Sequence, residues 1–487
     1  MKSAYLAATI RAAEGSLLAA QPGLLMQRAA AGLAAAILTE LGDLRVRGAY
    51  GARVLLAVGP GNNGGDALYA GVRLAARGVR VTAWRTGSSV HDEGWAAFRA
   101  AGGREVDAIG ALGELARTDL VVDGVLGIGG RPGLPAPVAL FAQACADAAV
   151  PVVAVDLPSG LAADSPVEPI EISSVEPVET THFAADVTVT FGGLKFCHVL
   201  QPAASRCGRL QLVDIGLELP EPDLLAWEPV DVVAVWPWPG QRSDKYSRGV
   251  AAVDTGSARY PGAAVLTVLG AVHAGAGMVR YIGSEPARGL VRAACPNVVW
   301  GEGRAQARLL GSGWGPRTEG AAEVEAALDR GGPLVLDADA LRYLPPDQPL
   351  GKHVLLTPHA GELAKLLSVD RSEVTADPIR AVRKAARQVD ATVVLKGASQ
   401  YVSGPDGAVS VAVPGPAWTA QAGSGDVLAG MCTALMAAGL APRLAALAAA
   451  SVQAMTAARR PGPHPPQEVA RRIPEVIGEL EAQARHS

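Results

Sequence analysis

The clearest chemical pattern in the chain lies late in the sequence, at Gly423-Ser424-Gly425-Asp426, directly before an apolar run with helical spacing. Two glycines around a small polar residue indicate a loop that turns sharply into a helix. The first backbone N–H groups of a helix have no partners within it, so with the helix dipole they form a cradle for a phosphate oxygen. The same dipole stabilises an ionised Asp426 as a proton acceptor. The pattern is typical of a phosphoryl-transfer site, although an ordinary capped helix with an acidic first turn would look the same.

Other polar residues in the second half of the chain follow predicted buried strands. They are Asp337 and Asp339, then His359 and Glu362, and finally Lys396. Because the carboxyl ends of parallel strands meet at one edge of a sheet, we expect these residues to lie together. Lys396 and the glycine amides could neutralise a nucleotide's phosphates, and the two aspartates could reach Mg²⁺ through water. The histidine and the glutamate could orient an acceptor hydroxyl whose proton passes to Asp426. Taken singly, each residue could instead be a helix cap or a loop residue.

The first half of the chain contains a second glycine-bearing loop, after a predicted buried strand at residues 53–58. Gly59, Gly61 and Gly64 match a dinucleotide-binding pattern, but Trp84-Arg85 occupies the place where an acidic residue would hold a ribose. The loop also carries Asn62, Asn63 and Asp66. Their side chains could accept hydrogen bonds or bind a cation, and the alternative is a polar turn. We therefore expect a ligand site other than an ordinary NAD site.

Two more predicted strands end in polar residues that would reach the same edge, Asp123 on one and Asp156 with Ser159 on the other. Together with Asn63 they provide oxygen ligands of mixed charge, which suit a hard and weakly bound cation. Asp156 could act on a substrate proton. Lys195 follows a later strand, and the chain has only seven lysines against thirty-six arginines, which makes an ordinary surface role for it less expected.

Composition limits the class of protein. At 487 residues the chain is long enough for two or three domains, and a net charge of −4 with interspersed charges predicts neither a nucleic acid nor a membrane partner. Five cysteines without a C-x-x-C pair predict reduced thiols; Cys197, His198 and Cys207 lack a fourth metal ligand. The N-terminus is too weakly charged and apolar for a secretory signal, and the run at residues 427–442 is too short to span a membrane. We expect a cytoplasmic protein.

The elements that must position these residues alternate along the chain. Two helices are predicted within residues 5–40, interrupted at Pro22-Gly23, and strands then alternate with helices in both halves, which predicts an α/β fold with parallel sheets. Residues 163–182 are acidic and proline-bearing and should form an exposed loop. Proline and tryptophan cluster between Leu217 and Gln241, so we predict a domain at 1–222, a linker at 223–240 and a domain at 241–487.

With these motifs in order, the chain resembles the bifunctional NAD(P)H-hydrate repair enzymes, which join an NAD(P)H-hydrate epimerase to an ADP-dependent (S)-NAD(P)H-hydrate dehydratase. The resemblance covers nearly the whole length. The epimerase pattern is matched by residues 62–66, 123–133, 155–160 and 188–192 with Lys195, and the dehydratase pattern by residues 260–263, 337–341, 357–362, 396–397 and 423–426. Departures from the pattern are Ala67 in place of a glycine, Ser312 in place of a proline, and Gln400 in place of a threonine.

The resemblance implies two three-layer α/β/α domains, the first Rossmann-like and the second ribokinase-like. In the first it implies K⁺ held by Asn63, Asp123 and Ser159, with Asp156 or Lys195 as the catalytic proton-transfer group. It further implies that the hydrate contacts Asn62, Asn63, Gly64, Gly65 and Asp66, the loop of Gly127, Ile128, Gly129, Gly130, Arg131, Pro132 and Gly133, and Asp156.

In the second domain the resemblance implies that Asp426 is the catalytic base and that Mg²⁺ and ADP take part. The hydrate would contact Ala263, Gly313, His359 and Asp426, and the adenine nucleotide would contact Lys396, Gly397, Ala398, Ser399, Gln400 and Gly425. The implied activity is metabolite repair by a homo-oligomer. One alternative is a ribokinase-like small-molecule kinase whose N-terminal domain only binds a nucleotide or a partner; a kinase would release a phosphorylated product instead of orthophosphate.

Overall fold

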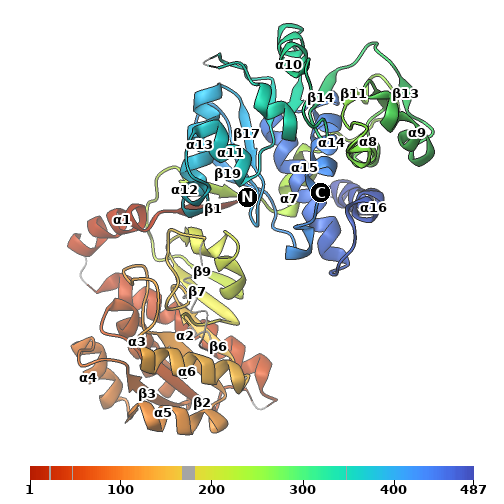
Figure 1. Cartoon of the computed structure of the whole chain (residues 1–487). Helices are drawn as coiled ribbons and strands as arrows, with labels where there is room; N and C mark the ends of the chain where they lie inside the picture. The colour runs from red at the N-terminus through yellow and green to blue at the C-terminus, as the bar shows by residue number, and fades with distance from the viewer. Residues whose placement is uncertain (21–22, 47, 167–180, 347, 487) are drawn as a thin grey trace. The chain divides into compact units, whose positions relative to one another are not determined.

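The computed structural model describes residues 1–20, 23–46, 48–166, 181–346 and 348–486. It divides into two compact units, shown in Figure 1. We call Ser3–Asp223 the N-terminal unit, and Leu224–Ser487 together with Met1–Lys2 the C-terminal unit. Most of the predicted exposed loop at residues 163–182 lies outside the described residues.

The N-terminal unit contains a seven-stranded sheet in the order β4-β3-β2-β5-β6-β7-β9, and every pair in it is parallel. Its strands are β2 (Arg53–Val58), β3 (Arg80–Arg85), β4 (Arg104–Val106), β5 (Leu120–Gly124), β6 (Val152–Val155), β7 (Val187–Phe191) and β9 (Arg209–Val213). The order places the ends of β2, β5 and β6 next to one another. A short pair, β1 (Lys2–Tyr5) and β8 (Leu194–Lys195), is also parallel.

Helices cover both faces of this sheet because successive side chains of a strand point to opposite faces. Val54, Leu56 and Val58 of β2 pack in one core cluster and Leu55 and Ala57 in the other. The first cluster contains residues of α2 (Leu24–Leu44), α3 (Asn62–Ala75) and α4 (Asp92–Ala100), and the second contains residues of α5 (Ala108–Glu114) and α6 (Ala136–Asp147). Helix α1 (Ala7–Ala20) precedes α2. Three layers result, as predicted.

Helix α2 is the one helix among the described residues that is long and apolar enough to cross a membrane. Its buried residues, among them Leu33, Ile37 and Leu41, pack in the same core cluster as β2 and α3. This arrangement is that of a core helix, and it explains why the segment is more apolar than an ordinary surface helix.

One local expectation in this unit needs correction. Residues 62–66 were expected to form a loop, but α3 already begins at Asn62, with Gly61 as its N-cap. Gly64 allows this close approach because a Cβ on it would lie 2.1 Å from the backbone oxygen of Gly59. The helix can therefore start directly at the end of β2, and its first residues face the sheet edge.

The C-terminal unit contains a second sheet in the order β13-β12-β11-β14-β15-β16-β17-β18-β19-β10. Neighbours are parallel from β13 to β17 and from β19 to β10, whereas β17-β18 and β18-β19 are antiparallel. The strands are β10 (Leu224–Ala226), β11 (Val250–Asp254), β12 (Met278–Tyr281), β13 (Val299–Trp300), β14 (Ala307–Leu310), β15 (Leu334–Leu336), β16 (Val354–Leu356), β17 (Thr392–Leu395), β18 (Tyr401–Ser403) and β19 (Val409–Val411).

Helices also cover both faces of this sheet. On one face lie α7 (Pro229–Val235), α8 (Pro261–His273), α9 (Glu285–Ala294), α14 (Ser424–Ala437), α15 (Pro442–Arg459) and α16 (Pro466–Ala484), which share a core cluster with the central strands. Helix α13 (Pro378–Val389) packs on β17 and β18 and against α11 (Ala360–Leu367), and α10 (Gly320–Asp329) and α12 (Arg371–Ala376) complete the helices. Within the stretch expected to be a linker, residues 223–240, the structure contains β10 and α7.

Candidate active sites

In the N-terminal unit, the predicted cation ligands meet where β2, β5 and β6 end. The Ser159 hydroxyl donates to Asp123 Oδ1 at 2.6 Å, and the Ser159 backbone N–H donates to Asp123 Oδ2 at 2.7 Å. Asn63 donates from Nδ2 to the Val155 oxygen at 2.8 Å, which leaves its own side-chain oxygen as an acceptor. A Cβ on Gly127 would lie 2.6 Å from that oxygen, so the loop after β5 closes against it.

Asp123 is the buried charge of this group. It is fully buried, and the hydrogen bonds that its carboxylate accepts come from neutral donors, Ser159 and the Val125 N–H. Burial raises its pKa to about 6, although these hydrogen bonds lower it. A buried carboxylate without a cationic partner costs free energy, and a bound monovalent cation would remove that cost. The donor set therefore fits K⁺.

Asp156 and Lys195 form a buried ion pair beside this group, in which Lys195 Nζ donates to Asp156 Oδ1. Lys195 is 1% exposed and also donates to Thr190 Oγ1 at 2.8 Å. Asp156 has a left-handed backbone with φ of 68°, a strained state that is common at functional sites. Burial alone would raise the pKa of Asp156, but the Lys195 ammonium outweighs it and holds the pKa below its usual value.

Two further carboxyl groups act electrostatically on this pair. Burial, followed by the charges of Asp156 and Glu14, raises the pKa of Asp66 well above its usual value. Burial and the charge of Asp156 also raise the pKa of Glu14. The site therefore combines an ionised carboxylate with carboxyl groups that hold a proton more tightly, which is the combination that proton transfer requires.

The loop that follows β5 borders the same place. The Ile128 N–H donates to Asp156 Oδ2 at 3.1 Å, and Arg11 of α1 donates to the Ile128 oxygen at 2.7 Å. The predicted substrate loop, residues 127–133, is thus anchored to Asp156 from one side and to α1 from the other. Sequence reasoning missed Arg11 and Glu14, because nothing in a surface-helix pattern shows which loop the helix will cover.

In the C-terminal unit, a cavity of about 650 Å³ opens beside the N-terminus of α14. Its lining includes three of the four predicted hydrate contacts, which are Ala263, Gly313 and Asp426. Gly313 has φ of +67°, and a Cβ on it would lie 2.4 Å from the Ala263 Cβ. Any side chain at this position would therefore clash with Ala263. Gly423 and Asp339 also line the cavity, as do Arg259 and Arg342 at its rim.

The glycine loop forms the helix N-terminus that the sequence predicted. Gly423 is the N-cap of α14 with φ of 93°, and Asp426 lies in the first turn. Burial raises the pKa of Asp426 to about 7; the charge of Asp337 raises it further and the Lys396 ammonium lowers it. Near neutral pH this carboxyl group therefore exchanges a proton readily, which suits a general base.

Lys396 lies next to Gly425 of the glycine loop and to the buried carboxylate of Asp337. Its Nζ donates to Asp337 Oδ1 at 2.9 Å, and a Cβ on Gly425 would lie 3.0 Å from Nζ. Asp337 is 1% exposed and also accepts from Ser312 Oγ and Thr357 Oγ1, each at 2.6 Å. Asp337 thus anchors Lys396, and it is not among the residues that line the cavity. Of the two predicted Mg²⁺ contacts, Asp339 is the one that lines the cavity.

The predicted nucleotide loop follows β17, next to Lys396. Gln400 donates from Nε2 to the Gly397 oxygen at 3.4 Å, and its Oε1 is buried without a hydrogen-bond partner. An unpaired buried acceptor is costly, and a ligand N–H or O–H group could satisfy it. The loop thus has the chemistry of a ligand site, although it does not line the cavity described above.

His359 lies beside Lys396, with which it forms a parallel bridge, as expected for two residues at neighbouring strand ends, but its ring caps a helix. Its Nδ1 accepts from the N–H groups of Gly361 and Glu362 at 3.0 and 3.2 Å, while Glu362 Oε2 accepts from the His359 N–H at 2.8 Å. The two residues therefore cap α11, and they line a second cavity of about 560 Å³. Arg342 lines both cavities, whereas His359 lines the second cavity alone.

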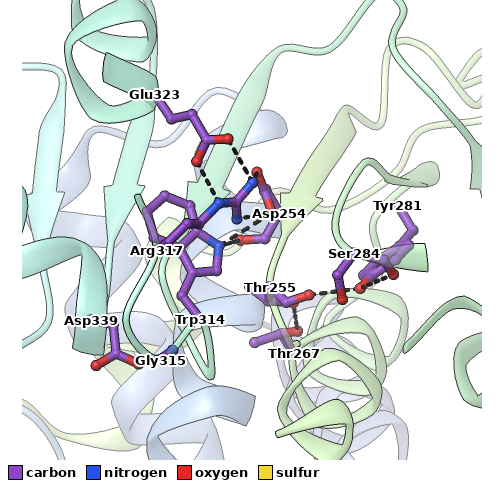
Figure 2. Close-up of polar contacts among 10 residues, drawn as sticks. All are labelled: Asp254, Thr255, Thr267, Tyr281, Ser284, Trp314, Gly315, Arg317, Glu323 and Asp339. Carbon is purple, nitrogen blue, oxygen red and sulfur yellow. Dashed lines mark hydrogen bonds and ion pairs between the residues drawn. The ribbon is translucent and has the colours of Figure 1, made fainter. Parts of the chain in front are cut away.

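Gly313 and Gly315 line the first cavity, and Trp314 between them belongs to a polar cluster that the sequence did not reveal. Figure 2 shows the contacts of this cluster. Arg317 bridges Asp254 and Glu323, and the Gly315 N–H donates to Asp339 Oδ2 at 2.8 Å. In the sequence Arg317 was one arginine among many, because its partners stand 63 and 6 residues away.

Two family models match the chain. One described as NAD(P)H-hydrate dehydratase matches residues 251–475, and one described as YjeF-related protein N-terminus matches residues 23–197. The bifunctional NAD(P)H-hydrate repair enzyme Nnr of Mycobacterium tuberculosis strain H37Rv is 45% identical over 452 residues, which covers 90% of each chain. The enzyme of the same name from Mycobacterium leprae is 44% identical over 478 residues, which covers 95% of this chain and 96% of that one.

An NAD(P)H-hydrate epimerase of Clavibacter michiganensis is 40% identical over 228 residues, 44% of this chain and 91% of that protein. Among solved structures, the ADP/ATP-dependent NAD(P)H-hydrate dehydratase from Bacillus subtilis, co-crystallised with ATP and Mg²⁺, is 27% identical with a TM-score of 0.48 and covers 53% of this chain and 98% of that one.

Proposed function

Because the chain belongs to the family of bifunctional NAD(P)H-hydrate repair enzymes, we propose that its two units repair hydrated NADH and NADPH in sequence. The N-terminal unit interconverts the R and S epimers of the hydrate. The C-terminal unit converts the S epimer back to NAD(P)H at the expense of ADP and releases AMP and phosphate. The dehydratase activity is supported above all by the position of Asp426, which lines the cavity at the N-terminus of α14. Lys396 lies next to it, against Gly425.

The dehydratase step needs a base, a phosphoryl donor and a place for the leaving phosphate. Asp426 takes the proton of the ring hydroxyl, whose oxygen then attacks the β-phosphorus of ADP while the bond to AMP breaks. The carbon–oxygen bond of the phosphorylated hydrate breaks next, the phosphate leaves with the electron pair, and loss of a proton from the neighbouring ring carbon restores the double bond. Phosphorylation thereby turns a poor leaving group into a good one.

The residues around Asp426 have separate tasks in this proposal. Lys396 and the first N–H groups of α14 stabilise the negative charge on the transferred phosphoryl group. Lys396, Gly397, Ala398, Ser399, Gln400 and Gly425 bind the adenine nucleotide. Ala263 and Gly313 shape the wall against which the hydrated ring lies, and His359 contacts the substrate beyond Arg342. Mg²⁺ would be held through water by Asp339 and by the nucleotide phosphates, where it offsets phosphate charge.

In the N-terminal unit, we assign proton transfer to the Asp156–Lys195 pair. The hydrate lies on Asn62, Asn63, Gly64, Gly65 and Asp66 and on the loop from Gly127 to Gly133. Asn63, Asp123 and Ser159 would hold K⁺, which neutralises the buried Asp123 and fixes the strand ends on which the substrate rests. We also place the enzyme in the cytoplasm as a homo-oligomer, and the five buried free cysteines agree with a reducing compartment.

The test mixes the purified chain with a hydrate preparation of both epimers, ADP and Mg²⁺, and follows the absorbance of the reduced nicotinamide together with phosphate release. The expected result is recovery of NADH or NADPH with one phosphate for each molecule repaired. Recovery of both epimers also requires the N-terminal unit, so the dehydratase alone leaves the R epimer behind. A stable phosphorylated product without recovered absorbance would instead identify a small-molecule kinase.

A further inference from the structure

A polar cluster lies behind one wall of the cavity in the C-terminal unit and consists of Asp254, Trp314, Arg317 and Glu323 (Figure 2). None of these four residues lines the cavity. Arg317 forms a fork on Asp254, with distances of 3.0 Å from Nη1 to Oδ1 and 3.3 Å from Nη2 to Oδ2. It also donates from Nη2 to Glu323 Oε1 at 2.7 Å. We call this group the Arg317 cluster.

Trp314 joins the cluster from the loop side. The Arg317 guanidinium lies 4.3 Å from the centroid of its ring, close enough for a cation–π contact. The indole N–H donates to the Asp254 backbone oxygen at 3.0 Å and to Oδ1 at 3.2 Å. Trp314 is 3% exposed, so its ring is fixed between the end of β11 and the guanidinium. Two different side chains of one loop thus hold the same aspartate.

Both neighbours of Trp314 along the chain, Gly313 and Gly315, line the cavity, as does Pro316. Gly313 lies against Ala263 on the opposite side of the wall. The Gly315 N–H donates to Asp339 Oδ2 and thereby sets the direction of a carboxylate that lines the cavity. Any movement of Trp314 would therefore move both glycines and release Asp339 from its backbone donor.

We propose that Arg317 is a positioning residue for the hydrate-binding wall, because it clamps Trp314 on Asp254 and thereby fixes Gly313, Gly315 and Asp339. The inference deepens the proposed dehydratase function and rests on it for its kinetic consequence. A lysine could supply the charge but neither the fork on two carboxylates nor the stacking on the indole.

The experiment compares Arg317→Ala and Arg317→Lys with Arg443→Ala in the full-length chain. Arg443 is the matched control because its side chain has the same exposure as that of Arg317, 25%, and neither it nor its partner Asp406 lines either cavity. Hydrogen exchange of the backbone amides at residues 311–317 measures the clamp itself without any turnover. Steady-state kinetics with the S hydrate and ADP then measure its effect on the reaction.

Loss of the clamp should raise amide exchange at residues 311–317 and raise the KM for the hydrate roughly tenfold in Arg317→Ala, with kcat changed much less. The exchange and the KM of Arg317→Lys should lie between those of Arg317→Ala and the wild type. Arg443→Ala should match the wild type in both measurements. Unchanged exchange at residues 311–317, or a loss of melting temperature with an unchanged KM, would overturn the proposal. If the wild-type chain does not repair the hydrate, the proposed function fails, whereas the exchange measurement still tests the clamp.

Discussion

The Lys396 ammonium lies 2.9 Å from Asp337 Oδ1, and this ion pair joins the ends of β15 and β17 directly beneath the glycine loop of α14. The charge of Asp337 also raises the pKa of Asp426, to which burial makes the largest contribution. In the proposed mechanism, one buried carboxylate therefore positions the cation that binds phosphate and raises the pKa of the base. The first prediction depends on this double role.

Asp337→Asn should shift the pH dependence of kcat/KM. The substitution removes the charge that raises the Asp426 pKa, and it frees Lys396 to act more strongly on Asp426, so the pKa of that base falls. The acid limb of the profile should move to lower pH by up to about one unit, and the KM for ADP should rise because Lys396 loses its anchor. Thr357→Val is the control, because it removes a neutral hydrogen bond to Asp337 without changing the charge of Asp337. The acid limb of this variant should stay in place. A shift of equal size in both variants would contradict the electrostatic explanation.

Asp426→Asn should lose nucleotide-dependent repair by a factor of about 10² to 10⁴, the usual contribution of a general base. Exchange between the two epimers should continue at the wild-type rate, because it takes place in the other unit. The measurement follows recovered reduced-nicotinamide absorbance for the first activity and the ratio of the two epimers for the second. Near-normal repair by this variant would remove Asp426 from the role of base.

The same aspartate should make stability depend on pH. Its folded pKa of about 7 lies above the ordinary value for an aspartate, so the folded state binds the proton more tightly than the unfolded state does. The stability that this proton contributes is complete at acid pH and is lost as the pH rises through 7. Asp426→Asn cannot ionise, so calorimetry should show the C-terminal unit of this variant melting above the wild type at pH 8, with a smaller difference at pH 5.5.

The proposed K⁺ site gives a prediction for the N-terminal unit. K⁺ should raise its melting temperature, because a ligand at about 100 times its Kd stabilises the folded state by about 2.7 kcal/mol. Asp123→Asn removes the buried charge, so this variant should lose the response to K⁺ and should melt no lower than the wild type in choline chloride. Calorimetry in KCl and in choline chloride at equal ionic strength makes the comparison, and an undiminished response in the variant would place the cation elsewhere.

Much of both sites could be predicted from the sequence because glycines and strand ends mark them locally. Gly423 and Asp426 act within one turn of one helix, and the parallel order of strands brings Asp123 and Ser159 together without further information. The family resemblance drawn from these motifs is confirmed by relatives that cover 90% or more of the chain. The α/β class and the three layers in each unit are confirmed as well.

The parts that could not be predicted depend on contacts between distant residues. Asp337 and Asp339 look alike in the sequence, but Ser312 and Thr357 donate to Asp337 from the ends of two neighbouring strands, while Asp339 lines the cavity. Ser312 was noted only as a departure from the family pattern, and its hydroxyl makes a hydrogen bond that proline cannot make. His359 follows its strand as expected, yet its ring turns back to cap α11. Sequence spacing gives a position along a strand but not the direction of a side chain.

The buried Asp156–Lys195 pair carries the last prediction, because its two members should be inseparable in function. Lys195→Met should abolish epimer exchange and should cost about 3 to 5 kcal/mol in stability, since it leaves the Asp156 charge buried without a partner. Asp156→Asn should abolish exchange equally, and the double variant should recover stability relative to Lys195→Met without recovering activity, because it leaves no unpaired charge. Nucleotide-dependent repair of the S epimer serves as the internal control and should survive in all three variants. Measurable exchange in both single variants, with losses that multiply in the double variant, would show that the two residues act independently.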